Sequence, residues 1–106
     1  FKNCKKLKSV KIGDNVSKID KYAFMGCGRL QSVTIGKGLT QIGSKAFYKD
    51  KSLKKVIIKS SNLKKVNAKA FSGISKKAVI DVPNKKIKKY KRILKKGNYP
   101  KNTKIR

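Results

Sequence analysis

The stretch Ala-Phe-Met-Gly-Cys-Gly-Arg-Leu-Gln-Ser-Val-Thr-Ile occupies residues 23–35 and decides the fold. It is one copy of a pattern that returns about every 23 residues, and a period of this length is typical of repeat architectures. A phenylalanine opens each copy, and the same kinds of side chain follow it at fixed distances. The copies begin at Phe1, Phe24, Phe47 and Phe71. The sequence therefore predicts one structural unit built several times.

The apolar positions form columns that persist from copy to copy. Three of them hold Leu7, Leu30, Leu53; Val10, Val33, Val56, Ile80; and Ile12, Ile35, Ile58, Val82. In each copy the residues of the second and third of these columns are two positions apart, so they share one face of a short strand. A single copy cannot bury that face alone, which predicts parallel strands stacked about 4.8 Å apart in a solenoid. A sandwich of unrelated strands is disfavoured, because all the columns would then have to coincide by chance.

The third copy is one residue longer than the others, and we place the extra residue at Ser60-Ser61, in the loop after its strand. Later columns also persist around this loop. They hold Val16, Leu39, Leu63; Ile19, Ile42, Val66; and Ala23, Ala46, Ala70.

The chain resembles the BspA-like leucine-rich repeats, whose unit is Ala-Phe-x-x-Cys-x-x-Leu-x-x-Val-x-Ile. The resemblance covers residues 1 to about 97, and it departs from the unit at Asp50, in the place of the cysteine, and at Lys77, in the place of the leucine. It implies a leucine-rich repeat solenoid, β-rich with short helical turns and right-handed stacked rungs. It also implies a bacterial or protist surface protein that binds other macromolecules and has no catalytic residues.

We divide the chain into a solenoid (1–83), a C-terminal cap helix (84–97) and an extended tail (98–106). Between residues 85 and 96, eight of twelve residues are Lys or Arg, and the others form an apolar stripe at helical spacing. We expect the stripe to close the end of the core, with Asn84 as N-cap and Gly97 at the helix end. The alternative is a helix that lies on an anionic membrane or in a calmodulin-like groove. Because the chain opens inside a repeat, we expect further rungs upstream.

The chain is strongly basic, with a formal net charge of +27 from 31 Lys and Arg residues against four acidic ones. Many of these lysines are expected to be solvated surface in a lysine-rich composition. Glutamate is absent altogether, however, and this asymmetry favours an anionic partner.

Two sets of exposed residues are the candidates for binding. The strand-face set is Lys8, Lys11, Gln31, Thr34, Lys54 and Ile57, and the cap set is Lys88, Lys89, Lys91, Arg92 and Lys95. The sequence thus indicates a non-enzymatic, extracellular or cell-surface adhesion module, monomeric, for a host protein or an anionic polymer such as a glycosaminoglycan or a teichoic-acid-like chain. The alternatives are a structural spacer held against anionic cell wall and a nonspecific polyanion binder. Nucleic acid is expected only through nonspecific phosphate contacts, since arginine is scarce and exposed aromatic residues are not spaced for stacking.

Residues suited to catalysis or to a cofactor are scarce. Histidine is missing, and the four aspartates lie in different copies or loops. Ser52-x-x-Lys55 and Ser61-x-x-Lys64 match a serine–lysine spacing, as chance predicts in so lysine-rich a chain. Gly26-Cys27-Gly28 and Gly36-Lys37-Gly38 are interpreted as turns, because neither completes a dinucleotide fingerprint. We expect no cofactor.

Cys4 and Cys27 occupy the same column of adjacent copies, so they are expected to be close neighbours. Buried free thiols and a disulfide both remain open, with free thiols favoured. A zinc site would need two more ligands, and none has the required spacing.

Overall fold

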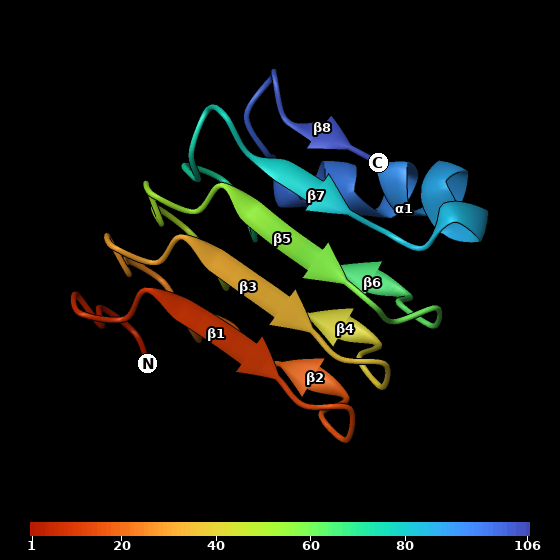
Figure 1. Ribbon diagram of the computed structural model, residues 1–106, viewed down its shortest axis with the longest axis horizontal. Coiled ribbons are helices and arrows are strands. Elements are labelled where there is room, and N and C mark those ends of the chain that lie inside the picture. Colours follow the sequence, from red (N-terminus) through yellow and green to blue (C-terminus); the bar gives the residue numbers. More distant parts are fainter.

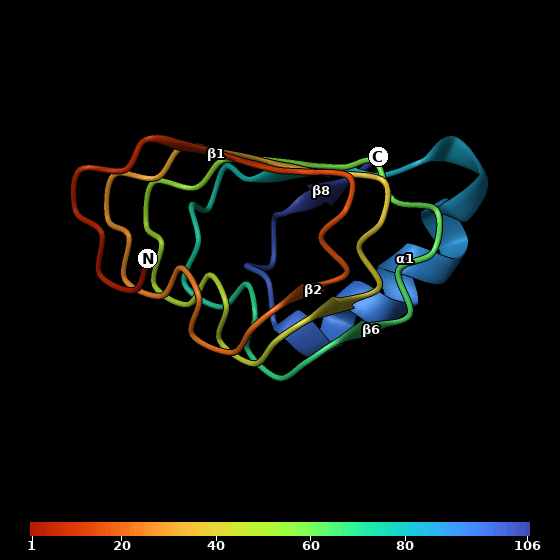
Figure 2. The same cartoon turned by 90° about the horizontal axis from the view of Figure 1, so that it is seen from below.

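The structure, a computed structural model, describes all residues 1–106, and it is built from two parallel sheets (Figure 1). The larger sheet holds, in spatial order, β1 (Ser9–Ile12), β3 (Ser32–Ile35), β5 (Lys55–Ile58), β7 (Val79–Asp81) and β8 (Lys104–Ile105). The smaller sheet holds β2 (Lys18–Ile19), β4 (Gln41–Ile42) and β6 (Lys65–Val66). Each copy forms one turn of the solenoid, here called a rung, and the two sheets run along opposite sides of it (Figure 2).

Equivalent positions of successive copies lie directly over one another. In the larger sheet Val10 pairs with Val33, Val33 with Val56, and Val56 with Ile80. The four phenylalanine rings form a continuous stack, with centroid separations of 5.7, 5.4 and 5.4 Å and interplanar angles of 4°, 4° and 8°. The predicted leucine-rich repeat solenoid of stacked parallel strands is therefore confirmed.

The core is one cluster of 24 buried apolar residues that runs the length of the stack. In β3 and β5 the valine and the isoleucine point inward and are buried, while the residues between them are only half-buried. The first rung is less covered, since Leu7 and Val10 are half-buried and Phe1 is 77% exposed. Burial of each apolar column thus depends on a neighbour on both sides.

The extra residue of the third copy lies in the loop between β5 and β6. Lys59 N–H donates to the Ile35 carbonyl, 24 residues earlier, and the equivalent bond of the rung before, Gly36 to Ile12, has the same separation. After the loop the separations differ by one residue, because Lys64 bonds to Thr40 whereas Thr40 bonds to Ser17. The insertion therefore falls between residues 59 and 64, where the sequence predicts it. Its Ser60 is buried and its hydroxyl donates to the Leu39 carbonyl.

A cap closes the C-terminal end of the stack. It consists of η1 (Asn84–Lys86), α1 (Ile87–Leu94) and η2 (Lys95–Gly97), and α1 lies beside β6 (Figures 1 and 2). Tyr90 and Leu94 are fully buried. The Tyr90 hydroxyl donates to the Ser60 carbonyl at 2.8 Å and accepts from Leu63 N–H at 3.0 Å, so it joins the cap to the inserted loop.

Both ends of the cap differ in detail from the prediction. Asn84 does not act as N-cap, since Pro83 holds that position before η1 and no side chain caps either helix. At the other end the left-handed residue is Asn98, with φ 55°, rather than Gly97. Gly97 instead avoids crowding, because a Cβ there would lie 3.0 Å from the Phe71 ring and 3.2 Å from Val66 Cγ1.

Two further expectations are corrected by the structure. Residues 98–106 do not form a separate tail, because they turn back and add β8 to the large sheet, where Ile105 pairs with Ile80. In the fourth copy Lys77 does not replace the buried leucine. Lys77 is exposed and Ala78 is buried in its stead, which avoids burial of an unpaired ammonium group.

Both cysteines are free thiols, Cys27 buried and Cys4 half-buried. The Cys27 thiol donates to the Phe1 carbonyl with an S–O distance of 3.2 Å. Gly26, Gly28 and Gly38 lie in turns, as predicted, and Gly36 directly precedes one.

Candidate functional site

The outer face of the larger sheet carries one half of the strand-face set, namely Lys11, Thr34 and Ile57. Lys11, Thr34, Ile57 and Asp81 form one outward column in register. Lys11 is exposed, whereas Thr34 and Ile57 are half-buried, so the expectation that Ile57 is exposed is only partly met. The column offers a lysine, a hydroxyl and an apolar side chain in succession along the solenoid.

The other half of the strand-face set lies just outside the strands. Lys8, Gln31 and Lys54 are exposed, but each precedes its strand by one residue. Their backbones are nevertheless aligned, because Gln31 N–H donates to the Lys8 carbonyl at 2.7 Å and Lys54 N–H to the Gln31 carbonyl at 3.1 Å. The outward positions at the start of the strands belong to Ser9, Ser32 and Lys55.

The last rung adds two cations that the sequence analysis missed. Lys104 lies in the same column as Lys55, and Arg106 follows β8 at the edge of the sheet. Arg106 Nε lies 3.3 Å from Asp81 Oδ1 and forms the one ion pair of the chain. The alternation Lys104-Ile105-Arg106 is a possible strand signal, but it is too short to distinguish from a loop.

Basic residues also gather in the loops that lead into the first strands. Lys5, Lys6 and Arg29 line a hollow of about 500 Å³ together with Gly26 and Gly28. No carboxylate lines this hollow.

All five residues of the cap set are exposed, but they lie on a different side of the molecule. Helix α1 follows the line of the smaller sheet, away from the outer face of the larger one (Figure 2). Lys91 alone among the five lines a hollow shared with the last rung, of about 430 Å³, together with Tyr99, Thr103, Lys104, Ile105 and Arg106. The structure therefore does not join the two predicted sets into one surface, and at this end Lys91 lies near Lys104 and Arg106, which belong to neither set.

The four aspartates neutralise little of the positive charge. Asp14 Oδ1 accepts from Lys37 N–H at 2.9 Å, Asp81 pairs with Arg106, and Asp50 is fully buried. Asp20 is exposed, and its carboxylate makes no ion pair within the chain.

Lysines of one column are mostly separated by an uncharged rung, as Gln31 separates Lys8 from Lys54. This keeps the lysines about 10 Å apart, near the screening length of salt water.

The buried Asp50 occupies the column of Cys4 and Cys27. Its Oδ1 accepts from Cys27 N–H at 2.7 Å, while its Oδ2 has no partner. Loss of hydration by burial raises the pKa of Asp50 to about 7, against the lowering effect of the backbone N–H groups of Cys27 and Gly26. Burial also raises the pKa of the Cys27 thiol.

The structure contains no group of three or more His, Cys, Asp or Glu side chains that could hold a metal ion. The Ser52 hydroxyl donates to the Gly28 carbonyl at 2.7 Å and so links two successive turns.

No helix has the length and apolar composition needed to cross a membrane.

Comparison with known proteins agrees with this architecture. A family model described as "BspA type Leucine rich repeat region (6 copies)" matches residues 1–102. No curated protein and no solved structure matches the chain. The family match covers the phenylalanine stack, the cap and every strand except β8, and the chain therefore belongs to the BspA-type leucine-rich repeat family.

Proposed function

We propose that this chain is a non-enzymatic binding module that engages an anionic macromolecule outside the cell, on a host or a cell surface. The outer face of the larger sheet, with the lysines beside it, is the principal binding surface. Membership of the BspA-type family supports a surface location and a binding role. The missing histidine and the scattered aspartates agree with a role without catalysis.

The observation that carries this proposal is the unbalanced charge of that face. Lys11, Lys55 and Lys104 point outward from three of its strands, and Lys8 and Lys54 adjoin them. Asp81 is the one carboxylate of the face, and Arg106 already pairs with it. An anionic polymer that runs along the solenoid axis would meet a cation at several rungs and would relieve the repulsion among them.

The cap set offers a second cationic surface for the same kind of partner. Its apolar stripe is used for docking, since Tyr90 and Leu94 are buried against the core. Lys88, Lys89, Lys91, Arg92 and Lys95 remain exposed. A long polymer could engage both surfaces around the C-terminal end, where Lys91 lies near Lys104.

The proposal is tested by binding to immobilised heparin, lipoteichoic acid and duplex DNA over a range of salt concentrations. A module that recognises an anionic polymer should bind at least one of them at physiological salt and lose affinity steeply as salt increases. A spacer without a ligand would elute from each immobilised polymer at the same salt concentration as from an ordinary cation-exchange resin. That result would contradict the proposal.

The contribution of the cap is measured by charge reversal of Lys88, Lys89, Arg92 and Lys95 to glutamate. All four are exposed, so the variant should keep its fold. Retention on heparin should fall if the cap surface takes part. Unchanged retention would remove the cap from the binding surface and leave the sheet face alone.

A further inference from the structure

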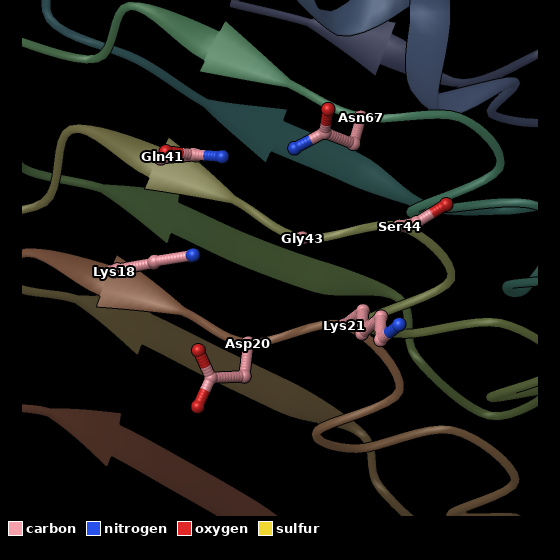
Figure 3. A pocket seen from close by; sticks show the side chains of 7 residues that line it. All are labelled: Lys18, Asp20, Lys21, Gln41, Gly43, Ser44 and Asn67. Carbon is pink, nitrogen blue, oxygen red and sulfur yellow. The ribbon is translucent and has the colours of Figure 1, made fainter.

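A separate hollow of about 550 Å³ lies on the outer side of the smaller sheet (Figure 3). It is lined by Lys18, Asp20, Lys21, Gln41, Gly43, Ser44 and Asn67. None of these residues is apolar, and none belongs to the strand-face or cap sets. The side chains come from three successive rungs.

The hollow arises from one column of the repeat. Asp20, Gly43 and Asn67 each follow the last residue of β2, β4 and β6. Only glycine fits the middle position, because a Cβ there would overlap the Lys21 backbone nitrogen and would lie 2.6 Å from the Asp20 carbonyl carbon. The floor between Asp20 and Asn67 is therefore bare backbone, and the neighbouring side chains form the rim (Figure 3).

The rim groups keep much of their hydrogen-bonding capacity free. The Asp20 carboxylate and the Gln41 carboxamide make no hydrogen bond within the chain. Asn67 Nδ2 donates to the Ile42 carbonyl at 3.0 Å, which leaves its Oδ1 free to accept. The Ser44 hydroxyl donates to the Ala68 carbonyl at 3.0 Å and can still accept. Lys18 and Lys21 have no ion-pair partner and supply donors.

We propose that this hollow binds one neutral sugar unit of a glycan through the hydroxyl groups of the sugar. Each sugar hydroxyl both donates and accepts, so it matches a rim that alternates carboxylate, carboxamide, hydroxyl and ammonium groups. The absence of apolar lining excludes a hydrophobic ligand. Asp20 offsets one of the two ammonium charges of Lys18 and Lys21, which favours a neutral ligand over an anion, and a single carboxylate is too few for a divalent cation.

This site does not depend on the function proposed above. It lies on the side of the solenoid opposite the outer face of the larger sheet (Figure 2), so either surface can bind when the other fails. Since no aromatic ring lines the hollow, one sugar unit is expected to bind with a dissociation constant in the millimolar range, about 4 kcal/mol of binding free energy. A repeated glycan would raise the apparent affinity by multivalent attachment.

The test is NMR titration of the ¹⁵N-labelled chain with lactose, cellobiose and chitobiose up to about 50 mM, well above a millimolar constant. The chain has two glutamines, Gln41 in the hollow and Gln31 beside the larger sheet, so their side-chain amide signals report on the two surfaces separately. The proposal predicts saturable shifts of the Gln41 and Asn67 amides, with Gln31 unmoved. The absence of any shift at Gln41 with all three sugars would overturn it.

Matched variants identify the groups that bind. Asp20→Asn keeps the shape of the side chain and should weaken binding by about fivefold to tenfold, because a charged hydrogen-bond acceptor becomes a neutral, weaker one. Gln41→Ala should weaken it by about threefold or more, and Gln31→Ala, the control, should leave it unchanged. Equal effects of Gln41→Ala and Gln31→Ala would contradict the assignment, as would shifts that appear with heparin and not with the neutral sugars.

Discussion

At the scale of single residues, Asp50 is the most unusual member of the core. Its raised pKa, about 7, exceeds the ordinary value of 3.8. Its contribution to stability is therefore fully present below pH of about 4 and is lost as pH rises through about 7. We expect the free energy of unfolding to fall by about 2–4 kcal/mol between pH 5 and pH 8, measured by urea denaturation at each pH.

The substitution Asp50→Cys separates this effect from other titrations. It restores the cysteine of the column, and a thiol there could donate to the Phe24 carbonyl, as Cys27 does to Phe1. The variant should be more stable than the parent chain at pH 8 and should lose most of the pH dependence. If its stability falls between pH 5 and pH 8 as much as that of the parent chain, Asp50 is not the group responsible.

Lys49 is a second destabilising residue, because its backbone conformation is strained. It has φ 61°, and the equivalent positions hold Asn3, Gly26 and Gly73, all with positive φ. A lysine in this region is strained, whereas glycine is not. We expect Lys49→Gly to raise the free energy of unfolding by about 0.5 kcal/mol. This is a net value, because the variant also loses the contact between the Lys49 ammonium group and the Tyr48 ring.

The control for this prediction is Lys51→Gly, at an exposed position in the next turn, two residues further along the chain. Lys51 does not have positive φ, so glycine there should lower thermal stability. A similar loss in both variants would show that the conformation of Lys49 carries no strain.

At the scale of elements, the cap depends on one buried hydroxyl. Tyr90→Phe would leave the Ser60 carbonyl and the Leu63 N–H without their partner inside the core. We expect a loss of about 2–3 kcal/mol in the free energy of unfolding, measured by chemical denaturation. Tyr99→Phe removes a hydroxyl that makes no hydrogen bond within the chain and should change stability little. Equal losses would contradict the role assigned to Tyr90.

The elements also show what the sequence can predict. The stacked columns, the site of the insertion at Ser60-Ser61 and the cap over residues 84–97 follow from spacing, because side chains that recur at fixed intervals must occupy equivalent positions. The return of residues 98–106 as β8 does not, since a strand of two residues has too short a pattern. The burial of Ala78 in place of Lys77 depends on a backbone adjustment that spacing cannot reveal.

The candidate site was predictable in part for the same reason. Alternation along a strand predicts that Lys11 and Thr34 point outward, and the register agrees. It does not predict where a strand begins, so Lys8, Gln31 and Lys54 fall one residue outside. The hollow around Gly43 combines three rungs, and no single stretch of sequence displays it.

At the scale of the whole molecule, the stack should be unequally stable along its axis. Within residues 1–106 the first rung packs against the second alone, and Phe1 is 77% exposed there. Backbone amides of β1 should therefore exchange with deuterium faster than those of β3 and β5, which have strands on both sides. Hydrogen exchange followed by mass spectrometry measures the difference. Uniform protection across the three strands would indicate that the rungs open together.

The most direct test of the binding account compares two variants of equal net charge. One carries Lys11→Ser, Lys55→Ser and Lys104→Ser on the larger sheet, and the other carries Lys18→Ser, Lys64→Ser and Lys65→Ser on the opposite side, all at exposed positions. The dependence of affinity for heparin on salt concentration is measured for both. The account predicts that the slope of log affinity against log salt decreases by about 2–3 for the first variant and hardly changes for the second. An equal decrease in both would mean that total charge, and not the face of the larger sheet, determines binding.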